Sequence, residues 1–116
     1  MASMTPFSPG DVILVRFPFT DLSSSKKRPA VALSTADFSG KYGDMVLLAL
    51  TSCPQEDAFR LEDWQEAGLL KPTWGKPLIA TISLSLAEAR LGTLSSRDKQ
   101  RVISMLDVIV PRGHEW

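Results

Sequence analysis

Hydroxyl and cationic side chains cluster in one polar segment of the first half of the chain. Three serines precede Lys26, Lys27 and Arg28, and Pro29 follows directly. Adjacent cations concentrate positive potential, and hydroxyls add hydrogen-bond donors. Proline restrains both its own φ and the residue before it, so we expect Arg28 to be held rigidly and the two lysines to lie on mobile chain. A rigid guanidinium suits bidentate contact with a phosphate.

A second pair of hydroxyls, Thr51 and Ser52, ends a later apolar run. Hydroxyl residues at a strand end usually form a turn or a cap. The alternative is a pair of hydrogen-bond donors beside the same anion, although spacing alone does not bring them close to Arg28. For the cationic segment, the alternative is a solvated surface loop between two strands.

Other catalytic and metal-binding signatures are absent from the sequence. There is no HExxH, GxSxG or CxxC motif, and Cys53 and His114 are the only residues of their types. This argues against a disulfide framework and against a metal site made of Cys and His ligands. Cys53 is interpreted as an idle or packed thiol, and His114 as part of a tail. A single cysteine also fits a reducing, cytoplasmic location.

The length and composition fit one domain over residues 1–116, with a core of about residues 9–110. Hydrophobic residues make up 44% of the 116 residues, and 13 Lys and Arg balance 13 Asp and Glu. Zero net charge excludes a global attraction to nucleic acid or membrane, so only a local basic patch could bind RNA. The longest apolar run, residues 45–50, falls far short of the ~20 residues of a membrane span.

The first half of the chain is predicted to form strands. Three apolar runs are mostly apolar on both faces, which is typical of central strands in a compact barrel. They cover residues 12–17, 29–34 and 45–51. The connections are predicted as a long polar loop over residues 18–28 and a hairpin loop over residues 35–44, which contains two glycines.

Shorter elements are predicted for the middle of the chain. We expect a short strand over residues 59–62, a helical turn over residues 63–67 ended by Gly68, and a loop between Pro72 and Pro77. Residues 78–84 then alternate as a strand, with its apolar side chains facing inward. These inward residues are Leu78, Ala80, Ile82 and Leu84.

A C-terminal helix completes the prediction. Ser95 is a good N-cap, and Asp98 stands at the position of a capping-box acid. One apolar stripe follows at helical spacing, formed by Val102, Ile103, Leu106 and Ile109. The expected fold is therefore a small, mostly antiparallel β barrel closed by a helix.

Charged residues segregate in the second half of the chain. An acidic stretch runs from Glu56 to Glu66, and basic residues follow from Arg90 to Arg101. We interpret both as solvated surface.

Five motifs, in this order and spacing, resemble the PemK/MazF family of toxin–antitoxin toxins over roughly residues 9–109. The first half carries GDVILV at 10–15, RPAV at 28–31 and the strand-end pair at 51–52. The second half carries GLLKPT at 68–73 and LGTLS at 91–95.

The resemblance implies a mainly β fold, a small SH3-like antiparallel barrel with a C-terminal α-helix of the CcdB/PemK type. It implies a homodimer that cuts single-stranded RNA without metal or cofactor, and a cognate antitoxin that occupies the RNA groove. The family's active-site arginine falls on Arg28, and its strand-end hydroxyl falls on Thr51. RNA contacts are implied for Lys26, Lys27, Ser52, Lys71 and Thr73.

The chemistry of RNA cleavage fits the first two of these residues. Attack by the 2′-hydroxyl needs an in-line backbone and stabilised charge on the phosphorus. Arg28 suits that charge, and Thr51 could hold a non-bridging oxygen. Arginine has a pKa above ~12, so the proton acceptor stays unassigned. The alternatives are a CcdB-like, non-enzymatic toxin that poisons a topoisomerase, using exposed aromatics such as Trp116, and an RNA-binding homologue without cleavage.

Overall fold

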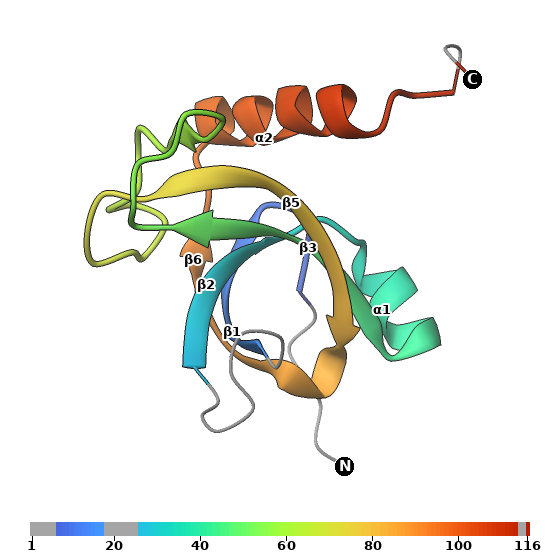
Figure 1. The fold of residues 1–116 in the computed structure, drawn as a ribbon. Helices are drawn as coiled ribbons and strands as arrows, with labels where there is room; N and C mark the ends of the chain where they lie inside the picture. Colours follow the sequence, from blue (N-terminus) through green and yellow to red (C-terminus); the bar gives the residue numbers. More distant parts are fainter. Residues whose placement is uncertain (1–6, 18–25, 114–115) are drawn as a thin grey trace.

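The computed structural model describes residues 7–17, 26–113 and 116. Within them, six antiparallel strands form one sheet in the order β4-β5-β3-β2-β1-β6. The sheet curls into a barrel-like shape whose edge strands β4 and β6 do not pair with each other, and α2 lies along one side of it (Figure 1). The prediction of a mainly β, barrel-like fold with a C-terminal helix is confirmed.

The elements follow the chain in a simple order. They are β1 (Asp11–Phe17), β2 (Lys26–Ala32), α1 (Ala36–Tyr42), β3 (Asp44–Thr51), β4 (Phe59–Arg60), β5 (Trp74–Ser83), the short 3-10 helix η1 (Leu84–Leu86), β6 (Ala87–Thr93) and α2 (Ser96–Ile109).

The three central strands β1, β2 and β3 bury apolar side chains on both faces of the sheet. Cross-strand neighbours Val12, Val31 and Leu48 belong to the core cluster that packs under α2. Ile13 and Ala30, one residue along, belong to a second cluster on the other face. Because side chains alternate along a strand, burial on both faces requires the near-continuous apolar runs seen in the sequence.

The prediction of a hairpin loop over residues 35–44 is wrong, because most of this segment forms helix α1. Thr35 caps its start, with its hydroxyl oxygen accepting a hydrogen bond from the Phe38 amide at 3.1 Å. Gly43 ends it in the left-handed conformation, with φ of 71°. Both caps are ordinary helix signals, and the glycines outweighed them in the sequence-based prediction.

The prediction of a loop between Pro72 and Pro77 is also wrong from Trp74 onwards, because β5 begins at that residue. Pro77 lies inside this strand, at an irregularity in the pairing with β3 between Leu48 and Leu50. A proline donates no ladder hydrogen bond, so a register irregularity accommodates it. Leu78, predicted to point inward, lies beside this irregularity and is 46% exposed.

The strand β6 was not predicted, because its sequence AEARLGT is charged and largely exposed. Helix α2 is confirmed with Ser95 as its N-cap. Its apolar stripe is confirmed for Val102, Leu106 and Ile109, which pack in or against the core, whereas Ile103 is 41% exposed. No helix in the described part of the chain is both long enough and apolar enough to cross a membrane.

Candidate active-site cleft

A cleft of about 420 Å³ opens mainly where four parts of the chain meet, and Leu14 of β1 adds to its lining. These parts are the start of β2, the end of β3, the loop over residues 61–73 and strand β6, which lie on the same side of the barrel (Figure 1). Its polar lining comprises Lys27, Arg28, Thr51, Ser52, Lys71 and Thr73. Its apolar lining includes Leu14, Pro29, Leu50, Leu69, Leu70 and Leu91. The cleft therefore brings together six of the seven site residues predicted from the sequence.

The strand register brings Arg28 and Thr51 to the same cleft. The ladder between β2 and β3 ends at the pair Ala30↔Ala49. Continuing that register by two residues brings Arg28 across from Thr51, and both line the cleft. Two strands adjacent in the sheet thus position a guanidinium and a hydroxyl that are distant in sequence.

The two lysines before Arg28 lie on strand β2, so the prediction of mobile chain there is wrong. Lys27 pairs with Arg16 across the β1–β2 ladder, and Lys26 pairs with Phe17. Residues 18–25 of the predicted loop lie outside the described residues. Lys26 is exposed and is not part of the cleft lining.

Arg28 is exposed, and no carboxylate within the described residues forms an ion pair with it. Its neighbour Lys27 differs, because its ammonium group lies 3.2 Å from a carboxylate oxygen of Glu88. An unpaired guanidinium at the edge of a cleft keeps its forked donors available for an anion.

Thr51 uses its hydroxyl oxygen locally and keeps its hydroxyl proton for a ligand. The Cys53 amide donates to Thr51 Oγ1 at 3.1 Å, which forms a turn directly after β3. A hydroxyl that accepts one hydrogen bond still has its own O–H to donate. Ser52 is exposed beside it, and Cys53 is exposed as a free thiol. The turn interpretation and the donor interpretation are therefore compatible.

The loop over residues 61–73 is closed at its base. The Leu61 amide donates to the Thr73 carbonyl at 2.9 Å, and the Thr73 hydroxyl donates to the Lys71 carbonyl at 2.8 Å. Thr73 is only 3% exposed, so it supports the loop rather than presenting a hydroxyl to the cleft. Leu70, by contrast, is 96% exposed, and Lys71 is exposed next to it.

Two glycines join this loop to strand β6. Gly68 has φ of 83°, and a Cβ there would overlap the carbonyl of Leu91. A Cβ on Gly92 would likewise overlap the carbonyl of Ala67. The motifs at 68–73 and 91–95 thus meet in one close contact between their backbones, and a side chain at Gly68 or Gly92 would not fit there.

The start of α2 fixes the other end of the loop. The Asp98 carboxylate is fully buried and accepts hydrogen bonds from the amides of Glu62 and Asp63 at 2.9 and 2.8 Å. The predicted capping box is therefore wrong in its second half, because Asp98 binds these amides. Ser95 does cap the helix, accepting from the Asp98 amide at 3.3 Å, and its hydroxyl donates to Asp63 at 2.6 Å.

An ion pair reinforces this junction. The Arg97 guanidinium donates to both Asp63 oxygens, at 2.7 and 2.8 Å. The hydrogen bonds from Arg97 and then Ser95 lower the pKa of Asp63 to about 2. Arg101 also lies 3.8 Å from Glu62. The acidic and basic stretches thus pair with each other in part, which the interpretation as separate solvated surfaces did not anticipate.

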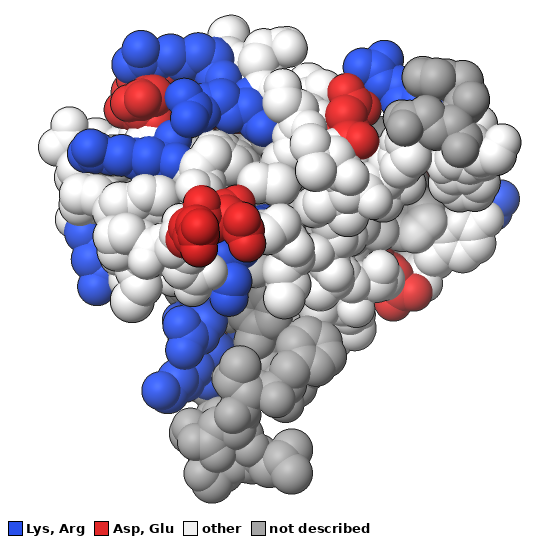
Figure 2. Space-filling view, turned by 45° about the horizontal axis from the view of Figure 1, so that its top comes forward, with Lys and Arg blue, Asp and Glu red and all other residues white. Residues whose placement is uncertain are grey.

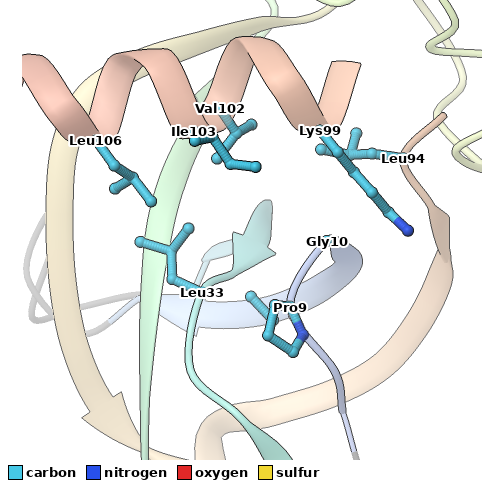
Figure 3. Close-up of a pocket in the computed structure, with 9 residues that line it drawn as sticks. Pro9, Gly10, Leu33, Leu94, Lys99, Val102, Ile103 and Leu106 are labelled. Atoms are coloured by element: carbon cyan, nitrogen blue, oxygen red, sulfur yellow. The ribbon is translucent and has the colours of Figure 1, made fainter. Parts of the chain in front are cut away.

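A second recess, of about 240 Å³, lies between α2 and the ends of β1 and β2 (Figure 3). Figure 3 shows Leu33 and Leu106 facing one another across it, with the Lys99 stem beside Gly10. Its lining is apolar apart from Lys99 and contains no hydroxyl side chain. This recess lacks the convergent polar groups of a reactive site, so the cleft at Arg28 is the better candidate.

Charge on the surface is local rather than global. Figure 2 shows Lys and Arg gathered mainly over one half of the face, with acidic residues among them. The described residues hold no group of three or more His, Cys, Asp or Glu that could bind a metal ion. His114 lies outside the described residues.

The protein is thus a small β protein whose curled antiparallel sheet carries a cleft lined by cationic and hydroxyl side chains. A family model, the PemK-like, MazF-like toxin of type II toxin-antitoxin systems, matches residues 8–110. The chain belongs to this family. The match supports the resemblance seen in the sequence and gives no support to the CcdB-like alternative.

Solved structures share the fold. MazF from Deinococcus radiodurans is 19% identical with a TM-score of 0.74, over 92% of this chain and 98% of that one. A MazE-MazF structure from the same organism is 19% identical with a TM-score of 0.74, over 91% and 97% of the two chains. An endoribonuclease in complex with its cognate antitoxin from a mycobacterial species is 16% identical with a TM-score of 0.70, over 92% and 95%. No curated protein sequence matches the chain.

Proposed function

We propose that this chain is an endoribonuclease toxin that cleaves single-stranded messenger RNA in its Arg28 cleft without a metal ion. The observation that carries the proposal is the exposed Arg28 guanidinium, free of any carboxylate partner in the described chain, in one cleft with the Thr51 hydroxyl. Family membership supports the same reaction, and the solved relatives with the same fold include endoribonucleases.

In the proposed reaction, the ribose 2′-hydroxyl attacks the adjacent phosphorus, and the bond from phosphorus to the 5′-oxygen breaks. Water takes the proton of the 2′-hydroxyl and supplies the proton of the 5′-hydroxyl product. The products are a 2′,3′-cyclic phosphate and a 5′-hydroxyl. Arg28 stabilises the charge that builds on the phosphoryl oxygens, and the Thr51 hydroxyl donates a hydrogen bond to one of them. The described residues that line the cleft include no carboxylate and no imidazole, so their proposed role is charge stabilisation and not proton abstraction.

The remaining cleft residues would hold the RNA strand. Lys71 supplies a second exposed cation, Ser52 a second hydroxyl, and Lys27 a cation shared with Glu88. Leucines between these groups give the bases apolar contact. With zero net charge on the whole chain, RNA affinity would come from this cleft alone.

The experiment is incubation of purified protein with single-stranded RNA of mixed sequence in excess EDTA. The proposal expects fragments that end in 2′,3′-cyclic phosphate, and their absence in a matched Arg28→Ala preparation. Growth arrest on expression in a bacterial host should likewise be relieved by Arg28→Ala. Intact RNA at high protein concentration, or RNA that Arg28→Ala cleaves at the wild-type rate, would contradict the proposal.

We also propose that the active form is a homodimer and that a cognate antitoxin covers the cleft. The support is family membership and the two relatives solved as toxin–antitoxin complexes. The dimer is tested by light scattering. The antitoxin is tested by searching the DNA beside this gene for a small reading frame and co-expressing its product, which should abolish RNA cleavage.

A further inference from the structure

A row of three charged side chains crosses β6, β1 and β2 beside the cleft. The Glu88 carboxylate lies 3.2 Å from Arg16 Nε through one oxygen and 3.2 Å from Lys27 Nζ through the other. The Glu88 side chain is 28% exposed, less than the side chain of either cation that it binds. One carboxylate thus binds two of the cations on the β1–β2 pair of strands.

The backbone of β6 is irregular at Glu88. Leu14 pairs with Ala89 and the next residue, Val15, pairs with Ala87, so Glu88 is the extra residue of a β-bulge. A bulge re-aims the side chain of its extra residue, and bulges are common beside active sites. Here the re-aimed side chain reaches Lys27, a residue that lines the cleft.

The three cations that line the cleft therefore differ in how much charge they offer to a ligand. Lys27 is matched by Glu88, whereas Arg28 and Lys71 have no carboxylate partner within the described part of the chain. A phosphate that binds Lys27 must either displace Glu88 or share the ammonium group with its negative charge. Phosphates bound at Arg28 and Lys71 meet no such competitor.

We propose that Glu88 limits the RNA affinity of the cleft by competing with a backbone phosphate for Lys27. The inference rests on the proposed function and names an affinity-determining residue for it. By neutralising Lys27, Glu88 lowers the attraction that any RNA strand feels. Binding then depends more on contacts at Arg28, Lys71 and the apolar lining, where the fit of the RNA matters. Exposed ion pairs are weak, so RNA can open this one at small cost.

The test measures binding of a single-stranded RNA with 2′-O-methyl riboses, which cannot undergo attack by the 2′-hydroxyl. Fluorescence anisotropy over a salt series compares wild type with Glu88→Gln. Glu56→Gln is the matched control, because it removes the same charge from an exposed residue outside the cleft lining. Glu88→Gln should bind about twofold to fivefold more tightly, the range expected for releasing one exposed ion pair. The slope of the logarithm of its binding constant against the logarithm of the salt concentration should steepen by about 0.7. This is the value for one added phosphate contact on a single strand.

A second pair of variants tests the route through Lys27 without relying on Glu88→Gln alone. In the wild-type background, Lys27→Gln should weaken binding less than Lys71→Gln. In the Glu88→Gln background, Lys27→Gln and Lys71→Gln should reduce RNA affinity by similar factors. With cleavable RNA, Glu88→Gln should lower KM and leave kcat unchanged.

Three results would overturn the inference. The first is an equal increase of RNA affinity in Glu56→Gln. The second is an increase of affinity in Glu88→Gln that persists when Lys27 is also replaced. The third is weaker RNA binding in Glu88→Gln than in wild type. If the wild-type protein binds this RNA and a variant gives one of these results, the inference about Glu88 fails but the proposed function stands. Wild-type protein that binds no RNA removes the proposed function, and the inference about Glu88 with it.

Discussion

The wall of the cleft that carries Arg28 and Thr51 is made of two strands, whereas the wall that carries Leu70 and Lys71 is a loop. The strand wall is positioned by the pairing of β2 with β3, whose backbone hydrogen bonds hold the two strands in register. The loop wall is held by a few specific contacts, namely the Asp98 carboxylate and the close approach at Gly68.

This difference separates chemistry from stability. Arg28 is exposed and free of ion pairs in the described chain, so its loss should affect RNA and leave the fold unchanged. Asp98 and Gly68 do not present a charge to the cleft, so their loss should first destabilise the fold and then misplace Lys71. The two walls can therefore be perturbed independently.

The largest effect is expected for Arg28→Ala in the strand wall. Removing one preorganised donor to the transition-state charge should slow RNA cleavage by about 10³-fold, with an unchanged melting temperature. Single-turnover cleavage and thermal unfolding are the measurements. Lys26→Ala, on the same strand but outside the cleft lining, is the control and should cleave RNA almost normally. Equal losses in both variants would show that only the basic segment as a whole matters.

In the loop wall, Gly68→Ala should lower the free energy of unfolding by about 3 kcal/mol. The new methyl group would strain a backbone with positive φ and overlap the Leu91 carbonyl. Gly40→Ala in α1 is the matched control, because open space surrounds that position. It should be neutral or stabilising by up to about 1 kcal/mol. Urea unfolding measures both, and a tolerated Gly68→Ala would show that the loop does not need this close approach.

Asp98→Ala should cost about 2 kcal/mol of stability, because two amides in the loop lose their buried acceptor. Arg97→Ala, which removes only an exposed partner of the same junction, should cost less. The RNA KM of Asp98→Ala should rise more than its kcat falls, since the loop carries Lys71 and not Arg28. Stability measurements in urea and steady-state kinetics test the two parts, and a loss confined to kcat argues against this division of the cleft.

The smallest effect concerns pH. Asp63 has its pKa lowered from 3.8 to about 2, first by the hydrogen bond from Arg97 and then by that from Ser95. Its stabilising contribution is therefore present in full above about pH 4 and is lost as the pH falls towards 2. Asp63→Asn should lower the melting temperature at pH 6, and its difference from wild type should shrink by pH 2. A difference that stays constant over this range would show that the ion pair does not couple to folding.

Sequence reasoning succeeded where local patterns decide the structure and failed where tertiary contacts decide it. Pro29 drew attention to Arg28, which lines the cleft, because proline restrains its neighbour locally. The apolar runs identified β1, β2 and β3 because burial on both faces requires them. Strand β6 escaped because an exposed edge strand needs no apolar pattern.

The loop wall was even less accessible to sequence reasoning. The Asp98 carboxylate binds amides 35 and 36 residues away in the chain, and helix spacing favoured a local capping box instead. Glu88 gave no signal either, because its proposed role depends on a bulge in the pairing of β6 with β1. Spacing in the sequence also did not show that Thr51 and Arg28 line the same cleft.

The central claim is that Arg28 and Thr51 act on one phosphate, and a double-mutant cycle tests it most directly. Single-turnover RNA cleavage would be measured for wild type, Arg28→Ala, Thr51→Val and the double variant, in EDTA. Groups that stabilise the same transition-state charge are coupled, so the double variant should lose much less than the product of the two single losses. Losses that multiply fully would show that the two residues act independently, and would contradict the account.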